Sequence, residues 1–181
     1  MSQLRLVGLC GALRAGSTNR KLMLNAARLF GDAAFAEGDL RLPLYDGDLE
    51  EAGGIPAPVQ RLADQIAAAD AVIISTPEYN KGLTGVLKNA LDWVSRVDGN
   101  PWRDTPVAVM SAAAGRAGGE RAQAMLRQAL VAFRPRLLTG PEIHLAQSGS
   151  QFDDNGRLTA ERYEAELSEL MRQLRAEAER G

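Results

Sequence analysis

Cysteine and histidine are almost absent from this sequence. Cys10 is the only cysteine, so no disulfide can form within the chain and nothing requires the protein to be secreted. Because Cys10 lies at the end of an apolar run, we expect a buried structural thiol rather than a nucleophile. His144 is the only histidine, and we expect it to be structural as well. No metal site is predicted.

Long apolar runs and an excess of either charge are also lacking. No stretch approaches the roughly 18 apolar residues of a membrane-spanning helix. The run 6–13 lacks a basic flank and is broken by Gly8 and Gly11, so it does not have the pattern of a signal peptide. The net charge of −2 gives no broad attraction to nucleic acid or to an acidic membrane. We therefore expect a cytoplasmic protein without a nucleic-acid or membrane partner.

What is present is typical of one soluble α/β domain. The 181 residues, 45% of them hydrophobic, are enough for a single core, and we assign residues 1–181 to one domain. Short apolar runs alternate with segments of 3.6-residue period, which indicates a doubly wound α/β fold. Five strands are expected, at 4–10, 39–44, 71–76, 106–111 and 136–145, the last with a break at Gly140-Pro141. Five helices are expected: one that begins at residue 19, one around 59–66, one over 87–97, one that ends at about residue 133 and one over 159–178. Residues 45–58 are expected to form a loop.

Three loops of unusual composition follow predicted strands, at 11–19, 77–82 and 112–119. In an open parallel sheet, ligands bind beyond the carboxyl ends of the strands, where the strand order reverses. Because all three loops lie at such ends, we expect them to meet at one mouth. The functional site is expected there.

The first loop has the composition of a phosphate cradle. Its backbone N–H groups, and the unpaired N–H groups at the start of the following helix, favour negative charge at one point. Ser17, Thr18 and Asn19 add neutral donors, and Arg14 adds a positive charge. The loop therefore predicts a bound phosphate.

Two common nucleotide motifs are missing from this loop. Gly11 and Gly16 have the spacing of a P-loop, but Ser17 stands where the lysine should be, which disfavours a nucleoside triphosphatase. The dinucleotide pattern G-x-G-x-x-G is absent as well. What remains is a cradle for one terminal phosphate, as in a mononucleotide, or a plain turn with a helix cap at Ser17 or Thr18.

The other two loops suit a flat group. Pro77 directly follows a predicted buried strand and leaves the next amides free to face a planar edge. Tyr79 is expected either to cover an aromatic ring or to pack on the rim, and Asn80 can donate and accept. The stretch 111–119 is rich in Ala and Gly, so its backbone can approach a ring closely. Arg116 is either a surface charge or a contact to an anionic ligand.

Three motifs, GALRAGSTN at 11–19, PEYN at 77–80 and GVLKNALDW at 85–93, together resemble the NAD(P)H-dependent FMN reductase family of flavodoxin-like proteins. That family includes quinone, chromate and azo-dye reductases. The resemblance extends over nearly the whole chain, in the same order and at similar spacing. It implies a flavodoxin-like three-layer sandwich, in which a five-stranded parallel sheet of order 2-1-3-4-5 has helices on both faces.

The resemblance also implies a set of FMN-binding residues. Those at the phosphate are Arg14, Ser17 and Asn19, with the backbone of Leu13 or Thr18. Those along the isoalloxazine edge are Pro77, Glu78, Tyr79 and Asn80, and those at the pyrimidine end are Ser111 and Gly115. Ala12 stands where many members of the family have serine, which removes one hydroxyl from the cradle.

The function implied is that of an FMN-dependent oxidoreductase with a ping-pong mechanism. NADPH or NADH would give hydride, and a quinone, free flavin, metal-ion complex or azo compound would receive the electrons. The flavin carries the chemistry, so no side chain is assigned a catalytic role. Backbone N–H groups of 111–115 would meet charge near N1 and O2 of the ring, with Arg116 or Arg96 as substrate-binding residues. A homodimer or homotetramer with FMN near the interface is expected, with the helix through Trp93 and Arg96 as an interface element.

Two alternatives remain open. The first is an FMN-bearing electron carrier without pyridine-nucleotide turnover of its own, although such carriers are expected to be far more acidic than this chain. The second is a binder of a mononucleotide or phosphosugar that uses no flavin.

Overall fold

The computed structural model describes residues 3–181, and all the strands in this range lie parallel in one sheet. The sheet order is β2-β1-β3-β4-β5, as predicted, and β6 also pairs with β4. The bounds of the strands are β1 Arg5–Cys10, β2 Ala34–Gly38, β3 Ala71–Thr76, β4 Pro106–Ala112, β5 Arg136–Leu137 and β6 Ile143–Leu145. The sixth strand arises because the predicted strand 136–145 is split at its Gly140-Pro141 break, where the peptide bond is cis.

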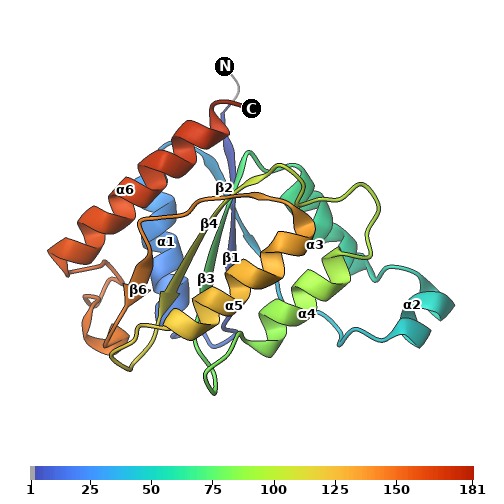
Figure 1. Ribbon diagram of the computed structural model, residues 1–181, viewed down its shortest axis with the longest axis horizontal. Helices are drawn as coiled ribbons and strands as arrows, with labels where there is room; N and C mark the ends of the chain where they lie inside the picture. The colour runs from blue at the N-terminus through green and yellow to red at the C-terminus, as the bar shows by residue number, and fades with distance from the viewer. Residues whose placement is uncertain (1–2) are drawn as a thin grey trace.

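Helices cover both faces of the sheet, as Figure 1 shows. On one face lie α1 (Thr18–Phe30) and α6 (Glu161–Ala178), and on the other lie α3 (Ala57–Ala67), α4 (Gly85–Val94) and α5 (Glu120–Leu130). Two short 3₁₀ turns, η1 (Val131–Phe133) and η2 (Ser148–Ser150), follow α5 and β6. The result is the three-layer arrangement that the alternation of apolar runs and amphipathic segments predicts.

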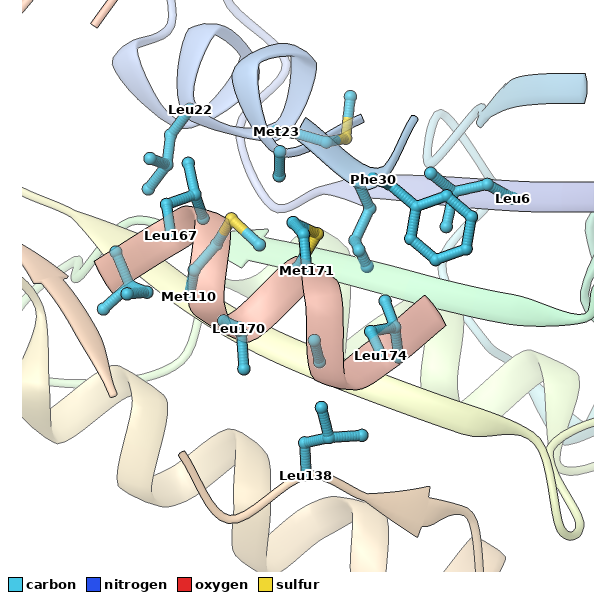
Figure 2. Close-up of a cluster of buried hydrophobic side chains, with 14 of the residues drawn as sticks. Leu6, Leu22, Met23, Phe30, Met110, Leu138, Leu167, Leu170, Met171 and Leu174 are labelled. Carbon is cyan, nitrogen blue, oxygen red and sulfur yellow. The ribbon is translucent and has the colours of Figure 1, made fainter. Parts of the chain in front are cut away.

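The central strand β3 explains why both faces must be covered. All six of its residues are buried, and they alternate between the two cores. Ile73 packs in the core under α1 and α6, whereas Val72 and Ile74 pack in the core under α3, α4 and α5. Figure 2 shows the first of these cores, where Leu22 and Phe30 of α1 face the apolar stripe of α6. A strand that is buried on both faces has a continuous apolar sequence, without the alternation of a half-exposed strand.

The predicted second strand, 39–44, is wrong. The strand β2 lies before it, where Ala34 to Gly38 pair with Arg5 to Leu9 of β1. Because β2 is a largely exposed edge strand, its sequence has no apolar run. The leucines at 40, 42 and 44 alternate with other residues, which is the pattern of a strand, although this segment forms none. Leu42 N donates to Leu40 O instead, a local turn that takes this segment out of the sheet.

The predicted loop 45–58 contains the helix α2 (Gly47–Gly53). Asp46 caps it by accepting from Asp48 N at 3.0 Å. No residue of α2 is buried, so the helix has no apolar stripe by which it could be recognised. In Figure 1 it projects at the edge of the molecule, beyond α4.

Other predicted bounds shift by a few residues. The helix expected to reach 97 ends at Val94, and the last helix begins at Glu161 rather than 159. No helix among residues 3–181 is long and apolar enough to cross a bilayer.

Candidate functional site

The loops at the carboxyl ends of the strands meet around a hollow of about 530 Å³. It brings together seven of the predicted site residues: Arg14, Ser17, Thr18, Asn19, Pro77, Glu78 and Tyr79. The remaining predicted residues do not line it: Leu13, Asn80, Arg96, Ser111, Gly115 and Arg116. Of these, Leu13, Asn80, Gly115 and Arg116 belong to the loops that form the mouth, and Ser111 belongs to the end of β4.

Gly11 shows how closely the first two loops approach one another. A Cβ on this residue would stand 3.0 Å from Thr84 Oγ1, 3.1 Å from Thr76 Oγ1 and 3.3 Å from Pro77 Cδ. A larger residue would push the first loop away from the second. The glycine therefore lets β1 and β3 bring their loops together at one point.

The start of α1 has the geometry of an anion site. Ser17 is the N-cap, and its Oγ accepts from Arg20 N at 3.2 Å. Arg14 is exposed and forms no ion pair with a carboxylate of residues 3–181. The unpaired first-turn amides, the hydroxyl of Ser17 and the charge of Arg14 are groups of the kind that bind phosphate in proteins.

Asn19 is placed differently from its predicted role at the phosphate. Its side chain is buried, and Nδ2 donates to Ala112 O at 2.8 Å. Oδ1 accepts from Ala112 N at 2.9 Å and from Ser75 Oγ at 3.0 Å. The side chain therefore braces the ends of β3 and β4, and the backbone N–H is the group of Asn19 left for a phosphate.

The second loop is a tight hairpin that presents an aromatic ring. Tyr79 and Gly82 exchange backbone hydrogen bonds of 3.2 and 3.1 Å around Asn80 and Lys81. Both central residues have positive φ, at 50° and 65°, as a type I′ turn requires. Tyr79 is 52% exposed at the mouth, so its ring is available to cover a flat ligand.

Glu78 lines the hollow, but its carboxylate is bonded to the start of α5. Its Oε2 accepts from Arg121 N at 3.0 Å and from Ala122 N at 3.4 Å, and Arg121 also pairs with the carboxylate. This arrangement caps the N-terminus of α5, where a negative charge is favoured. The only acidic side chain of the lining is thus already partnered, and it leaves the hollow without a free negative charge.

Buried polar side chains of β4 and α5 fix the third loop in place. The Ser111 hydroxyl is fully buried, donates to Gly118 O at 2.7 Å and accepts from Gln123 Nε2 at 3.1 Å. Gly118 has a φ of 59°, and a Cβ there would overlap the backbone of His144. Ser111 therefore fixes the loop, which leaves ligand contact to the small residues above it, Ala113 and Ala114.

A fourth loop, after β6, also lines the hollow and was not among the predicted site residues. Ser148 and Gly149 form this wall, and Ser148 Oγ lies 3.0 Å from Thr18 Oγ1. Ser148 N also donates to Ala113 O at 3.0 Å, which joins the third and fourth loops. Since β6 ends at Leu145, the rule that places ligands beyond strand ends would have identified this loop too.

Arg96 and Arg116 do not lie at the hollow. Helix α4 begins beside the second loop and rises about 15 Å along its ten residues, so Arg96 lies toward its far end. Arg96 Nε donates to both carboxylate oxygens of Glu50 at 3.1 and 3.0 Å. Arg116 is exposed on the third loop, outside the lining.

Cys10 and His144 have the surroundings expected of structural residues. The Cys10 thiol is buried, with its Sγ 3.4 Å from Ala12 O, and burial raises the pKa of the thiol above its ordinary value of 9.0. His144 belongs to β6, and its backbone packs against Gly118.

Comparison with known proteins gives consistent matches. Residues 4–149 match the family model described as NADPH-dependent FMN reductase. An NAD(P)H-dependent FMN reductase of Pseudomonas aeruginosa is 41% identical over 157 residues, which cover 86% of this chain and 84% of that protein. A quinone reductase of Escherichia coli K12 is 40% identical over 147 residues, which cover 77% and 76% of the two chains.

A solved structure also matches the whole chain. The flavoenzyme NAD(P)H:(acceptor) oxidoreductase FerB of Paracoccus denitrificans superimposes with a TM-score of 0.87 at 31% identity. The alignment covers 98% of each chain. The loops around the hollow therefore belong to a fold that is shared from end to end with a flavoenzyme.

Proposed function

Because this chain belongs to the NADPH-dependent FMN reductase family, we propose that its four-loop hollow binds FMN and admits NAD(P)H and a small-molecule acceptor in turn. Membership of the family makes the protein an NAD(P)H-dependent oxidoreductase with a flavin cofactor. The observation that carries the proposal is the hollow itself, which combines a phosphate cradle with a wall of small residues.

The residues of the hollow fit the two ends of FMN. At the phosphate end, the first-turn amides of α1, Ser17 and Arg14 supply donors and a positive charge. At the ring end, Pro77, Tyr79 and the alanines of the third loop offer a flat and largely apolar surface. Bound FMN would supply the redox chemistry, accepting hydride from NAD(P)H and giving electrons to the acceptor.

The backbone of the third loop is suited to hold negative charge at the pyrimidine end of the ring. The N–H groups of Ala114, Gly115, Arg116 and Ala117 donate no hydrogen bond to any of residues 3–181. Helix α5 begins directly after this loop, so its dipole adds to the effect. These groups are preorganised, since Ser111 and Gln123 fix the loop beneath them.

The acceptor is proposed to use the same face of the ring after the oxidised nucleotide leaves. Tyr79 stands half exposed beside this space, and the hollow is open to solvent at its mouth. Quinones, free flavin, metal-ion complexes and azo compounds are the proposed acceptors, and one relative is named a quinone reductase. Since one face serves both substrates, the proposed kinetics are ping-pong.

We further propose a cytoplasmic, single-domain subunit that forms a homodimer or homotetramer with FMN near the interface. Support comes from the segment around α2, a helix that has no buried residue. Tyr45 packs edge-on against Trp93 at 5.0 Å, and Glu50 pairs with Arg96. This arrangement leaves Leu44 81% exposed and Leu49 44% exposed, as expected of a surface that a second copy covers.

One spectroscopic experiment tests the proposed enzyme activity. The purified protein, saturated with FMN and kept anaerobic, is mixed with NADPH or NADH, and flavin absorbance is followed. We expect bleaching, and recovery of the absorbance when a quinone is added. Protein that binds FMN but is not bleached by either nucleotide would instead be an electron carrier. Protein that takes up no FMN at all would contradict the cofactor assignment.

A further inference from the structure

Lys21 is a second cation on the wall of the hollow, in addition to Arg14. It lies in the second turn of α1, lines the hollow and is half-buried. It forms no ion pair with a carboxylate of residues 3–181. Arg14 and Lys21 are therefore two cations that line the same hollow and have no carboxylate partner within residues 3–181.

The side chain of Lys21 is held in place rather than free in solvent. Its Nζ lies 5.6 Å from the centroid of the Phe152 ring, within range of a cation–π contact. Its stem packs on Gly156, where a Cβ would stand 3.7 Å from Lys21 Cγ. Asn25 holds this segment against α1, because its Nδ2 donates to Gly156 O and its Oδ1 accepts from Leu158 N. An ammonium group fixed in this way loses little entropy when it binds an anion.

The two cations lie on different sides of the Ser17 cap. The Arg14 guanidinium lies over Gly16 of the phosphate loop, and Arg14 also borders a neighbouring hollow formed with residues of β2. Lys21 is directed to the opposite side, toward the segment that follows β6. A phosphate at the Ser17 cap is thus served by Arg14, while Lys21 remains for another anion.

Further donors accompany Lys21 on its side of the hollow. The hydroxyls of Thr18 and Ser148 lie 3.0 Å apart and both line the wall. The N–H of Gly149, at the same wall, donates no hydrogen bond within residues 3–181. Because one of these hydroxyls donates to the other, the donors left for phosphate oxygens are the ammonium of Lys21, one hydroxyl and the amide of Gly149.

We propose that Lys21, with Thr18, Ser148 and Gly149, forms a second anion subsite that binds a phosphate of the pyridine dinucleotide. This inference rests on the proposed function, in which the electron donor brings further phosphates into the FMN-loaded hollow. NADH and NADPH share the pyrophosphate, and NADPH alone carries the 2′-phosphate. Lys21 also offsets the repulsion that a second polyanion would meet beside the FMN phosphate.

The test compares Lys21→Met with the wild type as FMN-loaded protein. Methionine keeps an apolar stem against Phe152 and removes the ammonium group with its charge and its N–H donors. Calorimetric titration with NADP⁺ and with NAD⁺ measures binding without turnover. We expect binding of at least NADP⁺ to weaken by about 10-fold, as for loss of a charge-assisted contact. Weakening of NADP⁺ alone assigns the 2′-phosphate, and equal weakening of both assigns the pyrophosphate.

Two controls separate this subsite from a general charge effect. Arg61→Gln removes one positive charge from an exposed position of α3 outside the hollow and should leave both affinities unchanged. Lys21→Arg should restore most of the affinity. Unchanged binding of both nucleotides in Lys21→Met would overturn the proposal, and so would a loss of FMN affinity as large as that of Arg14→Ala. If the wild type is not bleached by NAD(P)H, the proposed function itself fails, whatever the variant shows.

Discussion

Asn19 Nδ2 donates to Ala112 O over 2.8 Å and thereby joins the first turn of α1 to the end of β4. The same side chain accepts from Ser75 at the end of β3, so one amide links the start of α1 to the ends of two strands at the hollow. The loops of the site are therefore not independent. A change in one of them is transmitted to the others through this buried contact.

Replacing Asn19 with alanine should loosen the site and destabilise the protein. The change leaves the buried N–H and C=O of Ala112 without their partner, at a cost of about 1–3 kcal/mol for each group. We expect a lower urea midpoint and weaker FMN binding, both measured by fluorescence. Asn89→Ala is the matched control, since Asn89 also bonds backbone groups but outside the hollow. An unchanged midpoint for Asn19→Ala would contradict the bracing role.

Arg14→Ala should release FMN without affecting the fold. Arg14 is exposed and has no carboxylate partner among residues 3–181, so its loss removes nothing from the FMN-free protein. Loss of its contact with a phosphate should weaken FMN binding by about 10- to 100-fold, measured by flavin fluorescence titration. Arg61→Ala is the control for charge. Full retention of FMN at low protein concentration would count against the phosphate assignment.

Acid should release α2 from α4 at a pH that depends on Arg96. Hydrogen bonds from Arg96 hold the pKa of Glu50 below its ordinary value of 4.5. Because the pKa of Glu50 is lowered in the folded protein, its ion pair stabilises the contact fully at pH values above the ordinary pKa. The contact is lost as the pH falls through the lowered pKa. We expect Arg96→Gln to move this transition upward, toward the ordinary value.

The transition can be followed through Trp93, which packs against Tyr45 of the same cluster. A Trp102→Phe background removes the other tryptophan, so that the fluorescence of Trp93 is measured alone. The protein is then titrated from about pH 6 to about pH 3. Glu50→Gln should show no transition in this range. The same titration curve in the wild type and in Arg96→Gln would refute the role of this ion pair.

Cys10 should be unreactive in the folded protein and dispensable for turnover. Its side chain is 6% exposed and burial raises the pKa of the thiol, so little thiolate is present or accessible. A disulfide reagent should label it only after unfolding. Cys10→Ala should keep NADPH–quinone activity close to that of the wild type. Rapid labelling of native protein, or inactivation by the substitution, would show that the thiol takes part in function.

Some of this structure could be predicted because the information is local. The run Ala71–Thr76 is apolar on both faces, so its place in the middle of the sheet followed from its residues alone. The edge strand β2 and the exposed helix α2 could not be found in this way, since neither buries a continuous face. The leucines of 40–44 imitated a strand because alternation alone does not show whether a neighbour is available to pair.

The sequence by itself determined the α/β fold class, the strand order through the family resemblance, and the loops at 11–19, 77–82 and 112–119 as the place of the site. It also determined the family, through motifs that are contiguous in the chain. Only the tertiary structure decided which polar side chains face the hollow. Asn19 and Glu78 bond to backbone groups 93 and 43 residues away, and Thr18 meets Ser148 across 130 residues. Such partners are set by how the strands are ordered in the sheet, a property that no local pattern contains.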